Sequence, residues 1–262
     1  MKVAILTAVW QRPLIWAIWL QHHFPIFSAL DHDFTIYVAG NEIEHKQHLE
    51  KFSKAYGISV VWVEVENHPV SRKFNKAAKR AFSKGYDQYC IIGSDDLMTK
   101  GYIETALLLN APICGTREAP VVKINTDCST YSTVREIVHQ NTPISYFGPG
   151  KLPLLGSARF LSQVVMQGLK GSLYDRIMNS GLDAALDRRL FALHREISLI
   201  PMSFEDDTVV FVLKHGENIN NWVWFQHLEK LSVPDQNIRK LELLIRSAKA
   251  FYVEPKIVKQ DA

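Results

Sequence analysis

The sequence predicts an α/β fold with a mostly parallel twisted sheet flanked by helices, followed by a mixed C-terminal half. Continuous apolar runs such as residues 3–6 (VAIL) have the composition of parallel strands that are buried on both faces. Amphipathic stretches separate these runs, and turn-forming residues close them. This strand–helix alternation predicts βαβ units with a parallel sheet and right-handed crossovers.

The first half alternates regularly between the two kinds of element. Pro13 suits the first turn of a helix, and Gly57 and Gly85 suit the residues that follow two later helices. Apolar runs predict strands at residues 3–6, 34–39, 58–65 and 89–92. Helical spacing of apolar residues predicts helices from Pro13 to about Ser28 and at residues 42–56 and 69–84.

The second half is less regular and shows no internal repeat or low-complexity linker. Helices are expected at residues 102–109, 157–168, 180–193 and 237–251. Short strands are expected at residues 111–116, 121–124 and 208–212, with a Gly- and Pro-rich loop at residues 144–153 and a frayed tail at residues 254–262. We expect one domain over residues 1–262.

The composition argues against several classes of protein. A hydrophobic content of 47% and a charged content of 22% are typical of a globular protein, and the net charge of +3 does not indicate a nucleic-acid binder without a local basic face. Cys90, Cys114 and Cys128 lack C-x-x-C spacing, which favours a reducing compartment over a disulfide framework or a zinc site. Without a bilayer-length apolar run or a signal peptide, we expect a cytoplasmic protein with no stable membrane anchor.

Residues 88–98 (QYCIIGSDDLM) place two acids at the end of a predicted buried strand. Ligands of open α/β sheets bind at the carboxyl ends of strands, and Mg²⁺ or Mn²⁺ typically uses one or two carboxylates plus substrate phosphates. Asp95 and Asp96 therefore indicate a divalent-cation site, with a helix-capping Asp beside a surface Asp as the alternative. Because side chains alternate along an extended chain, we expect the two carboxylates to point to opposite sides.

Three stretches together resemble the GT-A fold glycosyltransferases, especially the large inverting group called family two. They are residues 7–13 (TAVWQRP), the Asn-bearing helix at residues 75–78 (NKAA) and the Ser94-Asp95-Asp96 element. The resemblance implies a GT-A fold with Mn²⁺ or Mg²⁺ as cofactor. It further implies a nucleotide-sugar-binding half at residues 1–100, an acceptor and catalytic half at residues 101–235, and a C-terminal helix and tail at residues 236–262.

The resemblance also implies roles for individual residues. Asp96 is expected on the metal together with His215, and Asp95 on the ribose or a nearby cation. The family's acid after the second strand is absent here, and Asn41 or Glu42 stands in its place. The residues expected to bind the donor are Thr7, Ala8, Trp10, Arg12, Asn41, Lys73, Asn75, Ser94, Asp95 and Lys214.

The segment from Gly181 to Asp187 is similar to the family's second acidic motif, which supplies the catalytic base. Inverting transfer needs a carboxylate that takes the proton of the acceptor hydroxyl. Asp183 is the first candidate, and Asp187, one helical turn later, is the second. A helix N-cap is an equally good interpretation of Asp183, and an exposed ion pair with Arg188 or Arg189 is the alternative for Asp187.

The expected reaction is metal-dependent transfer of a sugar from a nucleoside-diphosphate donor, first of all a UDP-sugar, to an acceptor hydroxyl. The acceptor is expected on a glycan, a lipid-linked glycan or a modified DNA base, in a bacterial or virus-infected bacterial cell. Basic helices at residues 72–84 and 237–251 offer faces for an anionic acceptor, or are simply solvated.

Two alternatives and one aromatic motif remain open. A DNA-modifying glycosyltransferase of a bacterial virus, acting on hydroxymethylated pyrimidines, would have to expose the base and would bind duplex with a steep salt dependence. A non-catalytic nucleotide-binding module can share the same fold. Trp222, Trp224 and Phe225 in the NNWVWF motif are expected to form a stacking platform for a sugar or base, or to pack in the core.

Overall fold

The computed structural model describes residues 1–124, 134–141, 154–193, 196–214, 225 and 227–252. The helices are α1 (Pro13–Ala29), α2 (Ile43–Tyr56), α3 (Val70–Phe82), α4 (Lys100–Leu109), α5 (Gln163–Gly168), α6 (Leu182–Leu193) and α7 (Asp235–Tyr252). The strands are β1 (Lys2–Ala8), β2 (Asp33–Gly40), β3 (Ser59–Glu64), β4 (Gln88–Ile91), β5 (Asp96–Met98), β6 (Ile113–Gly115), β7 (Glu118–Ile124), β8 (Val134–Asn141), β9 (Arg159–Ser162), β10 (Ser198–Leu199) and β11 (Val210–Lys214).

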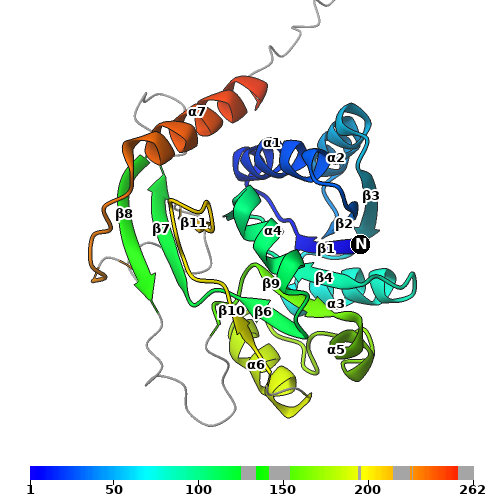
Figure 1. The fold of residues 1–262 in the computed structure, drawn as a ribbon. Helices are drawn as coiled ribbons and strands as arrows, with labels where there is room; N and C mark the ends of the chain where they lie inside the picture. Colours follow the sequence, from blue (N-terminus) through cyan, green and yellow to red (C-terminus); the bar gives the residue numbers. More distant parts are fainter. Residues whose placement is uncertain (125–133, 142–153, 194–195, 215–224, 226, 253–262) are drawn as a thin grey trace, which may run out of the picture.

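A seven-stranded sheet with the order β10-β6-β9-β4-β1-β2-β3 forms the centre of the fold (Figure 1). β1 pairs in parallel with both β2 and β4, and β2 pairs in parallel with β3. β9 runs antiparallel between β4 and β6, which makes the sheet mixed. The carboxyl ends of β1, β2 and β4 therefore lie at one edge, where an open α/β sheet binds its ligands.

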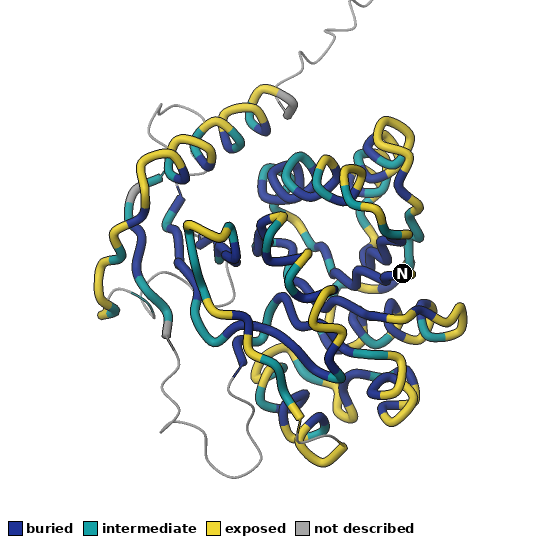
Figure 2. Tube along the Cα trace, in the orientation of Figure 1, coloured by how far each residue is buried: buried dark blue, intermediate teal, exposed yellow. Residues whose placement is uncertain are grey.

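Alternate residues of β1 point into two separate apolar layers, as the two-residue period of a strand requires. Val3 and Ile5 belong to a cluster with α1, α2 and α4, whereas Ala4 and Leu6 belong to a cluster with α3, α5 and α6. Figure 2 shows the resulting pattern, with the strands buried and the outer faces of the helices exposed. The continuous apolar sequence of β1 thus reflects burial on both faces.

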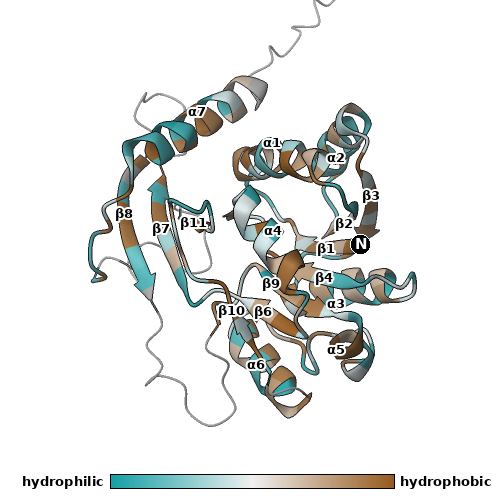
Figure 3. Ribbon diagram, in the orientation of Figure 1, coloured by the Kyte–Doolittle hydropathy of each residue, from teal (hydrophilic) through white to brown (hydrophobic). Residues whose placement is uncertain are grey.

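A second sheet of four strands, with the order β5-β11-β7-β8, lies beside the first (Figure 1). β5 is an edge strand of this sheet and pairs antiparallel with β11. Helix α7 turns Leu241, Ile245 and Ala248 inward, and its mixed teal and brown colouring in Figure 3 reflects this amphipathic pattern. The sequence continues from β4 into β5 through a short turn, so one segment links the two sheets.

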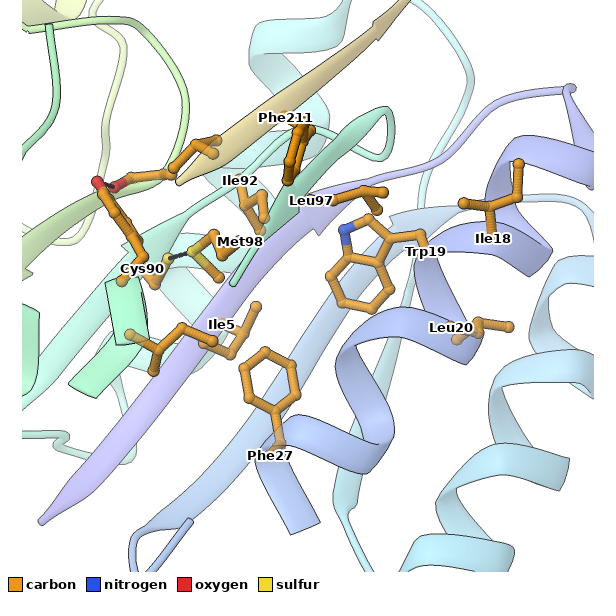
Figure 4. Close-up of a cluster of buried hydrophobic side chains, with 14 of the residues drawn as sticks. Ile5, Ile18, Trp19, Leu20, Phe27, Cys90, Ile92, Leu97, Met98 and Phe211 are labelled. Carbon is orange, nitrogen blue, oxygen red and sulfur yellow. Dashed lines mark hydrogen bonds between the residues drawn. The ribbon is translucent and has the colours of Figure 1, made fainter. Parts of the chain in front are cut away.

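Buried side chains join the two sheets into a continuous core (Figure 4). Ile5 and Cys90 of the central sheet lie in the same cluster as Leu97 and Met98 of β5. Trp19 of α1 is fully buried there, and the Sγ atom of Cys90 lies 3.7 Å from the Sδ atom of Met98. Strand β5 is therefore packed between α1 and the central sheet.

The predicted α/β class is confirmed, whereas the helix predicted at residues 157–168 is wrong in its first half. Arg159–Ser162 forms the central strand β9, and only Gln163–Gly168 is helical. Ser162 marks the change, because its side chain accepts a hydrogen bond from the Val165 N–H as an N-cap. A single apolar pattern ran across both elements and hid the boundary between them.

Other differences are local. Strands β5, β8 and β10 were not predicted as separate strands, while the remaining predicted elements in the described residues are present with shifted ends. The loop predicted at residues 144–153 and the tail at residues 254–262 lie outside the described residues. Within the described residues, no helix has the length and apolar content needed to cross a membrane.

Gly101 at the start of α4 allows the helix to lie against the backbone that precedes β11. A Cβ atom at Gly101 would lie 2.6 Å from the Asp206 carbonyl oxygen and 2.7 Å from that of Asp207. We therefore expect Gly101→Ala to lower the free energy of unfolding by about 1–3 kcal/mol through overpacking. This opposes the gain of about 1 kcal/mol that Ala normally brings to a helix.

Chemical denaturation measures this effect, and Thr105→Ala, one turn later on the half-buried side of α4, is the matched control. The control should unfold at the wild-type midpoint or above. A Gly101→Ala protein as stable as the control would contradict the close approach of the two backbones.

Candidate active site

A cavity of about 210 Å³ opens at the carboxyl end of β4 and gathers residues from distant parts of the sequence. Its polar groups come from the β4–β5 turn, the segment before β9, the start of α6 and the end of β11. The lining includes Gly93, Asp96, Gly156, Ser157, Tyr174, Asp183, Lys214 and Phe225. Two carboxylates and one ammonium group thus line one cavity.

Both aspartates of the Ser94-Asp95-Asp96 element lie close to Gly93. A Cβ atom at Gly93 would lie 2.5 Å from Asp96 Oδ2 and 3.0 Å from Asp95 Oδ1. The Asp96 N–H donates to the Gly93 carbonyl oxygen at 3.3 Å, which closes a turn. The prediction that the carboxylates point to opposite sides is therefore wrong, because the chain turns at Asp95 and is not extended there.

Asp96 is buried at the base of the cavity, with 6% of its surface exposed. Burial, and next the negative charge of Asp95, raise the pKa of Asp96 to about 7. The positive charge of Lys214 and a hydrogen bond from Ser157 act in the opposite direction. A cation placed beside this carboxylate would favour its charged form.

Asp95 is held by two cationic side chains. Lys214 Nζ lies 3.5 Å from Asp95 Oδ2, and Arg12 Nη1 lies 3.8 Å from the same oxygen. Arg12 Nη2 also donates to Ser94 Oγ at 3.0 Å. Gln11 and Arg12 both have left-handed backbone angles, with φ of 49° and 58°, which is uncommon for residues with side chains and typical of functional loops.

Asp183, in the first turn of α6, lines the same cavity. A Cβ atom at Gly156 would overlap the Asp183 carboxylate, so only glycine leaves room for it. Gly156 lines the same cavity. The structure therefore brings Gly156 into contact with the predicted acid Asp183.

Asp187 has a different environment from Asp183. Its Oδ1 lies 2.6 Å from Nη1 of Arg159, which is fully buried on β9. Arg159 also donates to the carbonyl oxygens of Leu154 and Leu155. The partner of Asp187 is therefore a buried arginine from another element, and not the expected exposed Arg188 or Arg189.

A polar network closes the ends of β1 and β2. Lys73 donates to the Val9 carbonyl oxygen at 2.6 Å and to Asn67 Oδ1 at 3.0 Å, and its burial lowers its pKa to about 8. Glu42 Oε1 accepts from the Gln11 N–H at 3.3 Å and from Asn67 at 3.2 Å. Glu42 therefore joins the loop after β1 to Asn67, a residue that was not predicted.

The other predicted donor residues are placed in different ways. Trp10 is half-buried and meets the ring of His68 edge-on at a centroid distance of 4.7 Å. Thr7 is fully buried on β1, and its Oγ1 has no hydrogen-bond partner among the described residues. Ala8 ends the same strand, while Asn41 is exposed and lines a separate cavity with Glu64, Val65, Glu66, Arg72 and Lys76.

Asn75 binds a backbone segment of the protein. Its Nδ2 donates to the Tyr174 carbonyl oxygen at 2.8 Å, and its Oδ1 accepts from the Tyr174 N–H at 2.9 Å. Ser71 likewise exchanges two hydrogen bonds with the backbone of Met178, and Asn179 Oδ1 accepts from the Val70 N–H. The first half of α3 therefore fixes the segment that leads to Asp183, which no local sequence signal indicated.

The C-terminal part of the predicted site is only partly described. His215, Trp222 and Trp224 lie outside the described residues, whereas Phe225 lines the cavity with Lys214 Nζ 5.5 Å from its ring centroid. The described residues contain no group of three or more His, Cys, Asp or Glu side chains placed to hold a metal. A metal here would need ligands from outside this set, as substrate phosphates would supply.

The sequence matches no known family model and no curated protein. Among solved structures, S. aureus TarS 1-349 superposes with a TM-score of 0.52 at 12% identity, over 81% of this chain and 60% of that one. Full S. aureus TarS also superposes with a TM-score of 0.52 at 12% identity, over 81% of this chain and 37% of that one. TarS 1-349 in complex with UDP superposes with a TM-score of 0.53 at 12% identity, over 95% of this chain and 65% of that one.

The chain thus spans less than two thirds of the length of each of these TarS structures. At 12% identity the likeness concerns the fold alone. The family-two assignment stays a prediction. The chain therefore shares the mixed α/β fold of these TarS structures, with a multi-strand sheet flanked by helices.

Proposed function

We propose that this protein transfers a sugar from a nucleoside-diphosphate donor, first of all a UDP-sugar, to an acceptor hydroxyl, with inversion at the sugar. The observation that carries the proposal is the meeting of Asp96, Asp183 and Lys214 in one cavity at the carboxyl end of β4. The likeness to a UDP-bound TarS supports the donor class. A binding module without chemistry would not need the second carboxylate.

We assign a divalent ion, Mn²⁺ or Mg²⁺, to Asp96, with Asp95 beside it. Carboxylate oxygens suit these ions, and the raised pKa of Asp96 reflects a buried acid that a cation would stabilise in its charged form. When bound, such an ion supplies Lewis-acid stabilisation of the leaving diphosphate. Lys214 and Arg12, which already flank Asp95, contribute positive charge to the same region.

We assign the base to Asp183. In the proposed step its carboxylate takes the proton of the acceptor hydroxyl, while the acceptor oxygen forms a bond to the anomeric carbon. The bond from that carbon to the diphosphate oxygen breaks, and the diphosphate leaves with the electron pair. Asp187 is the weaker candidate because its carboxylate is engaged by the buried guanidinium of Arg159.

Asp96→Asn tests the metal assignment. The variant keeps the shape of the side chain but loses the charge that a divalent ion needs, so Mn²⁺-dependent binding of UDP should weaken by at least about tenfold. Isothermal titration with UDP in the presence and absence of Mn²⁺ measures this. The exposed Asp206 provides the control, and Asp206→Asn should bind as wild type does. Equal Mn²⁺-dependent affinity in Asp96→Asn and wild type would refute the assignment.

Asp183→Asn and Asp187→Asn together identify the base. Asp183→Asn should lower kcat by about 10²–10⁴-fold with UDP affinity and unfolding free energy unchanged, because only proton transfer is lost. Asp187→Asn should lower the unfolding free energy by about 3 kcal/mol, because it leaves the Arg159 charge buried without its partner. Transfer assays and chemical denaturation of both proteins decide the matter. A folded Asp183→Asn protein with wild-type kcat would exclude Asp183.

Modified DNA is an alternative acceptor that can be tested directly. Helix α3 exposes Arg72, Lys76, Lys79 and Arg80, and the exposed Lys84 follows the end of the helix. If this face binds duplex DNA, affinity should fall by about 10²-fold or more between 50 and 200 mM salt. Fluorescence anisotropy at the two salt concentrations measures the DNA affinity of wild type and of the Lys79→Glu variant. Indifference to DNA at low salt would leave a glycan or lipid-linked acceptor.

A further inference from the structure

Strand β5 is a short edge strand that carries the proposed metal ligand at its first position. It spans Asp96–Met98 and pairs with β11 on one side only. Leu97 lies opposite Phe211, and Met98 lies opposite Val210. A buried edge strand needs partners for the backbone groups on its outer side, because an unpaired buried N–H or C=O group is costly.

Two adjacent histidines of α1 supply these partners at Met98. The Met98 N–H donates to His23 Nε2 at 3.1 Å, and His22 Nε2 donates to the Met98 carbonyl oxygen at 2.8 Å. Both backbone groups of one residue are thus satisfied by side chains from residues about 75 positions earlier in the sequence. Helix α1 therefore replaces a neighbouring strand at the outer edge of β5.

His23 is suited to accept this hydrogen bond. Its Nδ1 bonds to the Trp19 carbonyl oxygen at 3.1 Å, which places the ring proton on Nδ1 and leaves Nε2 as the acceptor. Burial lowers the pKa of His23 well below its usual value, so the ring stays neutral. Trp19 and Phe27 pack on the ring with centroid distances of 4.4 and 5.6 Å and fix its orientation.

The position of Met98 sets that of Asp96, because only Leu97 lies between them. Leu97 and Met98 are fully buried in the core shown in Figure 4, next to Ile92 and Trp19. A displacement of β5 along β11 would also displace the Asp96 carboxylate from its place beside Gly93. The hydrogen bonds at Met98, at one end of β5, therefore help to fix the position of Asp96 at the other end, where it lines the cavity.

We infer that His22 and His23 are positioning residues that hold β5 so that Asp96 presents its carboxylate to the donor cavity. This assignment rests on the proposed function, in which Asp96 binds the cation of the donor. Helix α1 thereby fixes the donor site through hydrogen bonds to the backbone of Met98, which does not line the cavity. Packing alone is the competing explanation, because His23 is also part of the apolar core.

The test compares His23→Leu with His23→Gln, and His22→Leu with His22→Gln. Leucine fills the space but cannot bond to Met98, whereas glutamine places an amide oxygen or nitrogen near the position of Nε2. Phe24→Leu is the matched control, because Phe24 is buried on α1 and its ring contacts those of Phe52 and Tyr56 on α2. The readouts are amide hydrogen exchange at Met98 and titration of UDP with Mn²⁺.

We expect Met98 exchange to be about tenfold faster in His23→Leu than in Phe24→Leu, and Mn²⁺-dependent UDP affinity to fall about 10- to 100-fold. His23→Gln should restore both toward wild type, and the His22 pair should follow the same order. Leucine and glutamine variants that match the control in both readouts would overturn the inference. Wild type that fails to bind UDP would instead refute the proposed function, while the exchange comparison would still report on the histidines.

Discussion

Two carboxylates beside a single glycine impose the constraint on which the rest of the site depends. Asp95 and Asp96 both approach Gly93, and Asp96 is buried, so their mutual repulsion and desolvation must be offset by positive charge. Lys214 from the end of β11 and Arg12 from the loop after β1 supply part of it. The fold thus brings two cations to one turn, and a donor-bound divalent ion would complete the compensation.

The surrounding fold fixes this turn and the opposing acid by separate means. Strand β5 is held on one side by β11 and on the other by the histidines of α1. Gly156 leaves room for the Asp183 carboxylate, and Asn75 of α3 holds Tyr174, which precedes α6, by two hydrogen bonds. An ion pair of α6 with the central sheet also fixes Asp183. In this ion pair, Asp187 of α6 binds Arg159 of β9, which is fully buried. Each acid therefore rests on contacts between elements that are distant in sequence.

The parts of the fold that the sequence predicts well are those with local causes. β1, β2 and β4 are predicted from apolar runs because burial on both faces leaves a continuous signal. Pro13 and Gly57 mark the start of α1 and the end of α2. β9 was missed because the apolar residues after Gly156 fit a helical spacing as well as a strand. The signal that could have found its end is Ser162, an N-cap in the middle of the predicted helix.

The candidate site divides in the same way. The tip of β4 and the region of Asp183 were predicted from short motifs, and both line one cavity. The partner of Asp187, the hydrogen bonds of Asn75 and the role of Glu42 depend on three-dimensional contacts that carry no local signal. The opposite-side prediction for Asp95 and Asp96 failed because it assumed extended backbone where the chain turns.

The most direct test of the central claim is a crystal structure with UDP and Mn²⁺, recorded with anomalous scattering to locate the metal. We predict a single strong anomalous peak between the Asp96 carboxylate and the diphosphate. Lys214 should lie on the diphosphate side of the cavity. UDP bound with its diphosphate away from Asp96, or Mn²⁺ bound elsewhere, would contradict it.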